Sequence, residues 1–286
     1  MKPLAQDTPL PIEQRWIAGL RERGALWRLR RMVGMTSFCW HAAADAYRRA
    51  RPDATPMARE AWLLQERYGS DIARKILEPC QRSGVASEAH MSTNRELWDA
   101  LLPVVGTLET LGVPYYVGGS VASSVTGVAR ATLDVDLVAA LHVEHAEPFA
   151  AALSPHYYVD VEMIQHAVRR YGSFNVIHLA SLFKVDVFVP EDTPFARANM
   201  HRRRALEVPE VGRTLYFCSP EDIVLHKLLW YSAGSGVSDR QWYDLQGVLR
   251  LQAQDLDLAY LQQWATELGI PGLLHRALEE AGLSGG

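Results

Sequence analysis

Two aspartates lie one residue apart in an otherwise apolar segment, Leu133-Asp134-Val135-Asp136-Leu137. In an extended strand, residues i and i+2 point to the same side, so both carboxylates share one face. Adjacent carboxylates repel each other, and burying one without a partner costs several kcal/mol. A divalent cation relieves this cost, because carboxylate oxygens are preferred ligands of Mg²⁺. The pair therefore favours a metal site over a solvated pair on an edge strand.

A third acid occupies the centre of a later strand-like segment, Phe183–Val189. Alternation places Asp186 on the same face as Lys184 and Phe188. If this strand lies beside the first one, three carboxylates converge, and such a set can hold two metal ions about 4 Å apart. Two other roles remain open for Asp186, namely a general base and a salt bridge to an arginine.

A glycine-rich turn, Gly118-Gly119-Ser120, follows a short apolar strand and precedes the aspartates. Glycines let backbone N–H groups approach a phosphate, and a serine hydroxyl adds a donor. The turn opens a short helix over residues 121–125, whose N-terminus favours anions. Such turns are common in purely structural roles, so the spacing to the two aspartates makes this one a candidate phosphate site.

These motifs form a recognisable set. Gly-Gly-Ser, a short helix, R-x-T-x-D-x-D and a later D-V-F together resemble the nucleotidyltransferase superfamily of DNA polymerase β, over roughly residues 95–250. Within it, the chain is most similar to small bacterial nucleotidyltransferase-like proteins, including the AbiEii type of toxin–antitoxin systems. Ser219-Pro220-Glu221-Asp222 followed by Lys227 resembles the lysine-bearing helix of that group. Residues 240–245, RQWYDL, resemble its last motif, with Gln241 where an acid is usual.

The resemblance implies an enzyme that moves a nucleoside monophosphate from an NTP to an acceptor and releases pyrophosphate. Acceptors in the group include RNA such as tRNA ends, proteins and small antibiotics, and a cognate protein partner is also implied. The catalytic, metal-binding residues would be Asp134, Asp136 and Asp186, holding Mg²⁺ or Mn²⁺. The nucleotide-binding residues would be Gly118, Gly119, Ser120, Arg130, Thr132, Lys227, Arg240 and Asp244.

Several of these residues also have a simpler interpretation. Arg130 could contact phosphate, hold an aspartate in place or form a structural ion pair. Lys227 could be a surface lysine, and Arg240 and Asp244, four residues apart on a helix, favour a surface pair. Basic residues at 166–170 and 201–204 could guide RNA, although charge runs are more often only solvated.

Two alternative functions stay open for the whole chain. One is a non-catalytic nucleotide-binding or regulatory protein, similar to an antitoxin, which the altered last motif favours. The other is an enzyme that modifies an aminoglycoside-like antibiotic, which needs an acidic pocket for a cationic substrate.

The surrounding pattern predicts an α+β fold in three parts. Residues 1–90 form an all-helical module, with Gly34 as a point of division in the first helix and residues 80–92 as a linker. Residues 91–218 form the core, a central mixed sheet flanked by helices, and residues 219–286 form a helical region. Ser219 and Pro220 mark a strong helix start. Four helices are expected there, at 220–231, 238–251, 257–268 and 271–281.

Charge and cysteine content limit the protein class further. Residues 1–90 carry 15 Lys and Arg against 10 Asp and Glu, whereas residues 91–286 carry 14 against 23. The basic first part could face a polyanion or simply be a solvated helical surface. Three scattered cysteines, Cys39, Cys80 and Cys218, argue against a disulfide framework. With no apolar leader and no membrane-length apolar run, a cytoplasmic protein that does not associate with membranes is expected.

Overall fold

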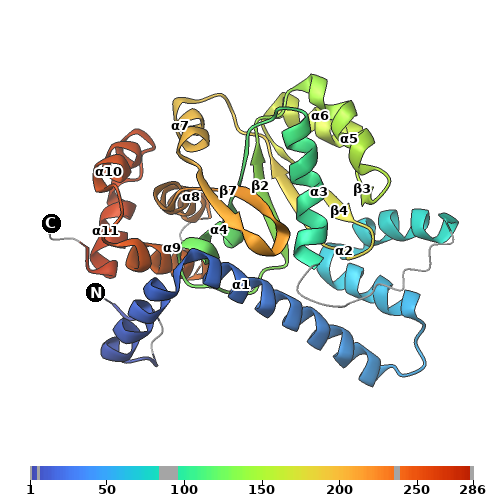
Figure 1. The fold of residues 1–286 in the computed structure, drawn as a ribbon, viewed down its shortest axis with the longest axis horizontal. Coiled ribbons are helices and arrows are strands. Elements are labelled where there is room, and N and C mark those ends of the chain that lie inside the picture. Colours follow the sequence, from blue (N-terminus) through green and yellow to red (C-terminus); the bar gives the residue numbers. More distant parts are fainter. Residues whose placement is uncertain (1, 5–6, 84–95, 235–238, 284–286) are drawn as a thin grey trace.

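The computed structural model describes residues 2–4, 7–83, 96–234 and 239–283. A central mixed β-sheet lies between helices, with the N-terminal helices below it and the C-terminal helices at one end (Figure 1). The α+β fold expected from the sequence is therefore observed. The division into three parts at residues 90 and 218 stays a prediction, because residues 84–95 lie outside the described chain.

The sheet has seven strands in the order β3-β4-β5-β2-β1-β7-β6. The pairs β2–β5 and β1–β7 are parallel, and the other neighbours are antiparallel. The strands are β1 (Tyr115–Val117), β2 (Asp134–Ala139), β3 (Tyr157–Tyr158), β4 (Ser173–His178), β5 (Lys184–Phe188), β6 (Arg204–Val208) and β7 (Arg213–Phe217).

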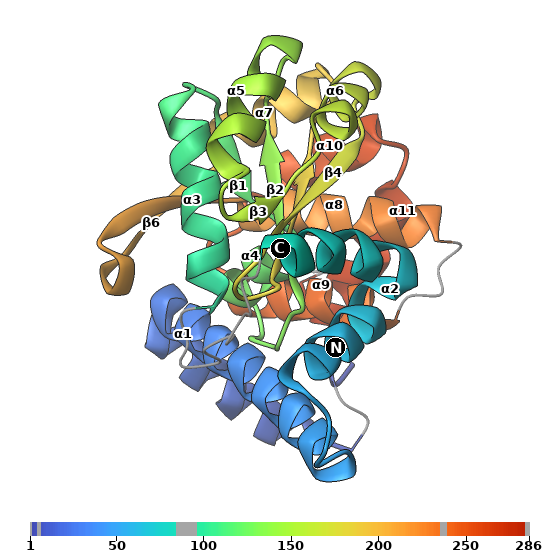
Figure 2. The same cartoon turned by 90° about the vertical axis from the view of Figure 1, so that its right-hand side faces the viewer.

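One face of the sheet is buried under helices. In β2, Val135, Leu137 and Ala139 are fully buried and alternate with half-buried residues on the other face. The buried face packs against α3, and Figure 2 shows the sheet between α3 on one side and α8 on the other. The helices of this central part are α3 (Glu96–Thr110), α4 (Gly119–Thr126), α5 (Ala146–Leu153), α6 (Val161–Arg170) and α7 (Pro194–Arg202), with two 3₁₀ turns, η1 (Val143–His145) and η2 (Pro209–Val211).

The N-terminal region consists of two long helices, α1 (Leu10–Ala50) and α2 (Pro56–Ser83). The expected division of the first helix at Gly34 is wrong. The break is at Gly24, which has a φ of 73°, while Gly34 lies within continuous helix. The continuity has a physical reason, since Leu29, Met32 and Val33 belong to the main hydrophobic core and need one unbroken helical face to reach it.

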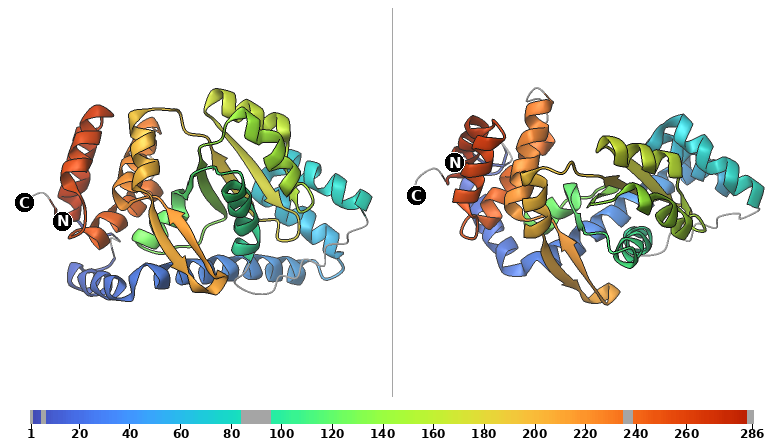
Figure 3. Two further views of the ribbon diagram at one scale, coloured as in Figure 1. Left: turned by 45° about the horizontal axis from the view of Figure 1, so that its top comes forward. Right: turned by 90° about the horizontal axis from the view of Figure 1, so that it is seen from above.

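Four C-terminal helices follow the sheet and agree with the predicted positions. They are α8 (Pro220–Ala233), α9 (Asp239–Gln252), α10 (Leu258–Glu267) and α11 (Pro271–Ala281). The Ser219 side chain caps α8 by accepting a hydrogen bond from the backbone N–H of Asp222. The start of α1 and the end of α11 lie at the same end of the molecule (Figure 3), where the Lys2 N–H donates to the Glu280 carbonyl at 3.0 Å.

Two expectations about cysteines and membranes bear on these elements. Cys39 is exposed and Cys218 is buried, and both are free thiols. Among the described residues, no helix combines the length and the apolar character needed to cross a membrane. The cytoplasmic location stays a prediction.

Candidate active site

The three aspartates lie on two adjacent parallel strands. The register of β2 and β5 places Asp136 directly opposite Asp186, and Asp134 opposite Lys184. Because side chains alternate along each strand, all four lie on the sheet face that α3 leaves open. The sequence predicted the shared face of each strand, and the structure brings the two strands together.

Lys184 introduces a cation into this acidic cluster. Its Nζ lies 2.6 Å from Asp186 Oδ2 and 3.8 Å from Asp134 Oδ2. The three side chains are only partly exposed, so the attraction is stronger than that of a surface pair. Lys184 therefore neutralises part of the negative charge. The sequence reasoning placed it on this face and gave it no role.

Asp136 carries the largest electrostatic penalty of the cluster. Burial, with the added charges of Asp134 and Asp186, raises its pKa to about 6. A backbone hydrogen bond from Ser120 and the charge of Lys184 oppose this rise. Burial also raises the pKa of Asp186, against the effect of Lys184. The site thus holds more negative charge than its own cation balances.

The donor set suits a hard divalent cation. Three carboxylates that repel one another offer the oxygen ligands that Mg²⁺ and Mn²⁺ prefer. Within the described part of the chain, no three acidic, histidine or cysteine side chains are arranged around a common point with metal-binding geometry. Lys184 Nζ stands between Asp134 and Asp186, so a metal ion would have to displace the lysine from these oxygens.

The glycine turn packs directly against the acids. Gly119 has a φ of 51°, and a Cβ built on it would lie 1.7 Å from Asp136 Oδ2. Ser120 Oγ and Thr132 Oγ1 are 2.6 Å apart, and Thr132 Oγ1 lies 3.2 Å from Asp134 Oδ1. Since a carboxylate only accepts, Thr132 donates to Asp134 and Ser120 donates to Thr132. The two hydroxyl groups thus hold Asp134 in place in this structure.

Replacement of Gly119 tests how closely the turn and the acids depend on each other. We expect Gly119→Ala to weaken Mn²⁺ binding at least about tenfold and to cost about 1–2 kcal/mol of stability, because alanine is strained at positive φ and its methyl group displaces Asp136. Gly118→Ala is the matched control, since its Cβ would meet nothing closer than 3.8 Å. Calorimetric Mn²⁺ titration and chemical denaturation measure both effects. Equal effects of the two substitutions would contradict this account.

A buried charge cluster lies beside the turn. Arg130 donates to both carboxylate oxygens of Asp244, at 2.9 and 2.8 Å, and Lys227 Nζ donates to Asp244 Oδ2 at 3.0 Å. Lys227 and Asp244 are 6% and 3% exposed. Burial alone would raise the pKa of Asp244, but hydrogen bonds and charges from Arg130 and Lys227 outweigh it and hold that pKa below its usual range. Burial lowers the pKa of Lys227, and Asp244 opposes this.

This cluster corrects two expectations from the sequence. Asp244 does not form a surface pair with Arg240, because α9 buries Asp244 against Arg130 and Lys227. Lys227 is not a surface lysine either. Gln241, which stands where an acid is usual, accepts a hydrogen bond from Lys227 Nζ at 2.8 Å. Arg240 is exposed at the edge of the site and forms no ion pair with any residue that the structure describes.

These groups surround one cavity of about 530 Å³. The aspartates of β2, the glycine turn, Arg130, Thr132, Lys227 and Arg240 line one part of it. The rest of the lining was not predicted from the sequence. The available signal was the helical spacing of Ile223, His226 and Trp230 at i, i+3 and i+7, which puts these three side chains on one face of α8. The additional side chains are Tyr116, Val138, Phe188, Pro190, Phe195, Ala196, Ile223, His226 and Trp230.

The basic runs have different surroundings. Arg202 and Arg204 pair with the buried carboxylate of Glu221, at 3.3 and 3.5 Å. Arg169 and Arg170 are exposed at the end of α6. Arg202 and Arg204 of this run thus stabilise the junction of α7, β6 and α8, so they are not merely solvated as the simpler interpretation expected.

Comparisons with known proteins give only distant likenesses, all among solved structures. A search of solved structures found an antigenic nucleotidyltransferase-like protein from Paracoccidioides brasiliensis, 16% identical, with an alignment covering 65% of this chain and 93% of that chain and a TM-score of 0.39. No protein-family profile matches the chain, and a search of curated proteins found no significant match. The interpretation of the site therefore rests on its own geometry.

Proposed function

We propose that the protein is a metal-dependent nucleotidyltransferase, which moves a nucleoside monophosphate from an NTP to an acceptor hydroxyl. The observation that carries the proposal is the register of β2 and β5. It aligns Asp136 with Asp186 and sets Asp134 on the same face, against the Gly119 turn and inside a cavity. A nucleotidyl transfer needs this combination of clustered carboxylates and phosphate donors.

Each residue has a stated task in this proposal. Asp134, Asp136 and Asp186 would hold Mg²⁺ or Mn²⁺, which supplies positive charge to the reacting phosphate when bound. The backbone N–H group at Gly119 binds a phosphate oxygen, whereas the Ser120 N–H already donates to Asp136. Within the described residues, Lys227 uses two of its three donors on Gln241 and Asp244, and the third would donate to the triphosphate.

The proton of the acceptor also needs a destination. The acceptor oxygen forms a bond to the α-phosphorus, the bond to the β-phosphate oxygen breaks, and pyrophosphate leaves. Asp186 is suited to accept the hydroxyl proton, because burial raises the pKa of its carboxyl above the ordinary value. Arg130 and Asp244 act as positioning residues that fix Lys227.

A labelled-nucleotide experiment tests this function. Incubation of the protein with α-labelled NTPs, Mg²⁺ and candidate acceptors, including RNA and the protein itself, should transfer the label and release pyrophosphate. Absence of transfer with every nucleotide, together with metal-independent nucleotide binding in calorimetry, would favour the non-catalytic alternative. The ion pairs of Lys184 with the acids are the specific observation on the side of that alternative.

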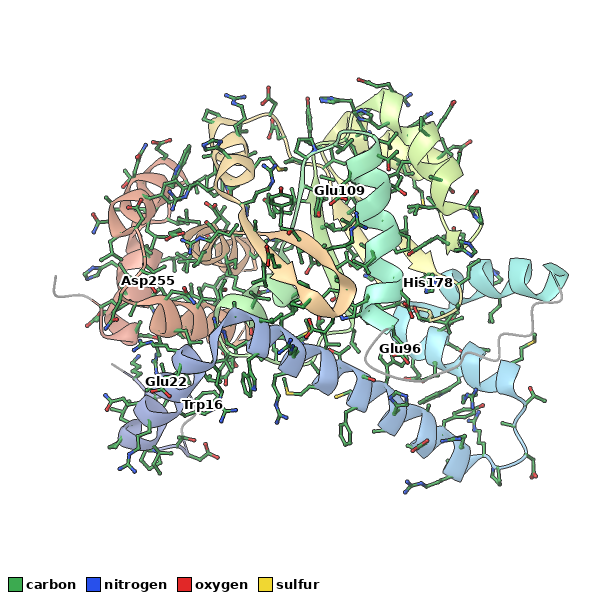
Figure 4. All side chains as sticks on the ribbon, viewed as in Figure 1. Trp16, Glu22, Glu96, Glu109, His178 and Asp255 are labelled. Carbon is green, nitrogen blue, oxygen red and sulfur yellow. The ribbon has the colours of Figure 1, made fainter. Side chains whose placement is uncertain are left out.

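RNA is the acceptor class that the surface of α1 favours. A groove of about 570 Å³ runs between α1 and residues 128–129, just before Arg130 of the site. Its lining includes three exposed arginines and two tryptophans, and Arg23 Cζ lies 4.7 Å from the ring centre of Trp27. Arginines interleaved with aromatic rings bind single-stranded nucleic acid through phosphates and base stacking. Figure 4 labels Trp16 on this part of α1. The other arginines and the second tryptophan that line the groove are Arg15, Arg31 and Trp27.

Charge reversal in the groove tests this acceptor class. We expect the triple variant Arg15→Glu, Arg23→Glu and Arg31→Glu to weaken binding of single-stranded RNA at least tenfold and to lower the slope of log affinity against log salt by about 2, at about 0.7 per lost phosphate contact. Fluorescence anisotropy at several salt concentrations measures both.

The control carries the same charge change at the far end of the same helix and at the residue that caps it, Arg48→Glu, Arg49→Glu and Arg51→Glu. If both triple variants lose RNA affinity equally, the groove has no special role. The implied protein partner and the link to toxin–antitoxin systems stay predictions from the sequence.

A further inference from the structure

The part of the cavity beyond the acids has a different character. Along the open face of the sheet, Tyr116, Val138 and Phe188 stand opposite one another in the register. Each lies two residues from the row of Gly118, Asp136 and Asp186, a distance of about 7 Å along a strand. An aromatic and apolar row thus follows the acidic row on the same floor.

Helices α7 and α8 and the segment before α7 supply the opposite wall. Phe195 and His226 have ring centres 5.3 Å apart, and Pro190, Ala196 and Ile223 complete the lining. No carboxylate or fixed cation belongs to this set, so a charged group gains nothing here. A flat, uncharged ring suits these walls, because aromatic side chains attract other rings in stacked or edge-to-face contact.

Tyr116 brings an unused polar atom to this end. The residue is 4% exposed and lines the cavity, and its hydroxyl has no hydrogen-bond partner within the described part of the chain. Buried hydroxyls are usually paired. This hydroxyl is not among the described polar atoms that are both unpaired and shut off from solvent, so it keeps contact with the cavity. The hydroxyl is therefore available to a bound molecule.

His226 offers an acceptor in the same region. Its Nε2 lies 2.9 Å from Asn199 Oδ1, and Asn199 Nδ2 donates to the Phe195 carbonyl at 2.5 Å. The amide oxygen accepts, so Nε2 carries the proton and Nδ1 keeps a free lone pair. Burial lowers the pKa of His226 to about 4, which keeps the ring neutral near pH 7.

We infer that this end of the cavity binds the aromatic base of the nucleotide, and that the Tyr116 hydroxyl and His226 Nδ1 select it by hydrogen bonding to its edge. The inference rests on the proposed function, because the triphosphate must lie at Gly119 and Lys227 for the base to reach this row. The ligand class is thus a nucleoside triphosphate with its ring held by the protein. A pocket for phosphates alone would not need these walls.

Comparison of nucleotides with inorganic tripolyphosphate separates the two ideas. Calorimetry with the full chain and Mn²⁺ should show at least one of ATP, GTP, CTP and UTP binding more tightly than tripolyphosphate. Tyr116→Phe keeps the ring and removes only the hydroxyl. We expect this variant to bind the preferred NTP about threefold to tenfold more weakly than the wild type. The differences in affinity among the four NTPs should become smaller, and the affinity for tripolyphosphate should stay unchanged. Tyr171→Phe, at an exposed tyrosine, is the control.

The outcomes are distinct. Equal affinity of the wild type for all NTPs and tripolyphosphate would overturn the base site and leave the proposed function standing. The base site would also be overturned if Tyr116→Phe weakened NTP binding and tripolyphosphate binding equally. The same holds if Tyr116→Phe changed only the affinity for the acceptor. If tripolyphosphate does not bind, or binds equally to Asp136→Asn, the proposed function itself fails.

Discussion

Asp136→Asn should abolish nucleotide transfer and, without metal, make the protein more stable. The reason is electrostatic: the folded protein holds an ionised carboxylate that burial and two neighbouring acids disfavour, with a pKa of about 6. Removing this charge should add about 1–3 kcal/mol to the free energy of unfolding above pH 6. Transfer should fall by roughly a thousandfold, which corresponds to the several kcal/mol that a bound metal ion contributes.

The sign of the pH dependence follows from the raised pKa. The folded state binds the proton more tightly than the unfolded chain, so the penalty is full above pH 6 and disappears as the pH falls below the ordinary value of 3.8. The stability gain of Asp136→Asn should shrink over this window. Denaturant unfolding in EDTA at pH 7.5 and pH 4 measures it, with Asp192→Asn, a 77% exposed acid, as the control.

Addition of Mn²⁺ should reverse the order of the two proteins. The wild type gains stability by binding the ion, whereas Asp136→Asn lacks a ligand and gains little. If the variant shows equal stabilisation by Mn²⁺, or retains nucleotide transfer, the acids are not the metal site. If Asp136→Asn is less stable than the wild type in EDTA, Lys184 compensates the negative charge of the acids and the ionised Asp136 carries no penalty.

Asp244→Ala should cause the largest loss of stability of any substitution proposed for this protein, about 3–5 kcal/mol. The substitution leaves the buried ammonium of Lys227 without its carboxylate and removes both acceptors of the Arg130 fork. Breaking a buried ion pair from one side is costly because an uncompensated charge remains inside. Urea denaturation measures the loss.

Two further variants make this prediction specific. Glu210→Ala breaks an exposed pair with Arg30 and should cost less than about 1 kcal/mol. Replacing Asp244 together with its more buried partner, Lys227→Met with Asp244→Leu, should recover the part of the loss due to the unpaired ammonium, because apolar groups of similar size are tolerated where a buried pair stood, while Arg130 still lacks its acceptors. A small effect of Asp244→Ala would mean that Lys227 reaches water in the folded state.

The site residues were predictable from strand geometry up to the pairing of the strands. Alternation alone assigned Asp134 and Asp136 to one face and Asp186 to the face of Lys184 and Phe188. Which residue of β5 stands opposite Asp136 depends on the long connection through α5, β3, α6 and β4, and no local pattern encodes that register. The cation role of Lys184 follows only from this register.

The helices show where local patterns fail. Asp244 looked like a surface partner of Arg240, but α9 is buried on every side from Asp244 to Leu251, so polarity does not mark an outer face there. Similarly, either Gly24 or Gly34 could end a helical segment, since glycine is tolerated in both states. The helix breaks at Gly24 and continues through Gly34, because Leu29, Met32 and Val33 between them pack into the core. Helix α7 and the two-residue strand β3 were missed because their segments lack a clear apolar period.

One contact ties the start of β2 to the first helix of the chain. The Thr132 amide donates to Thr36 Oγ1 at 3.1 Å, and Thr132 in turn donates to Asp134. A shortened protein without residues 10–50 would leave that amide unsatisfied, and it would lose Leu29, Met32 and Val33 and so uncover the core residues that they pack against. The helix is therefore not a removable appendage, and any transplant of β2 and β5 to another scaffold must carry an equivalent brace.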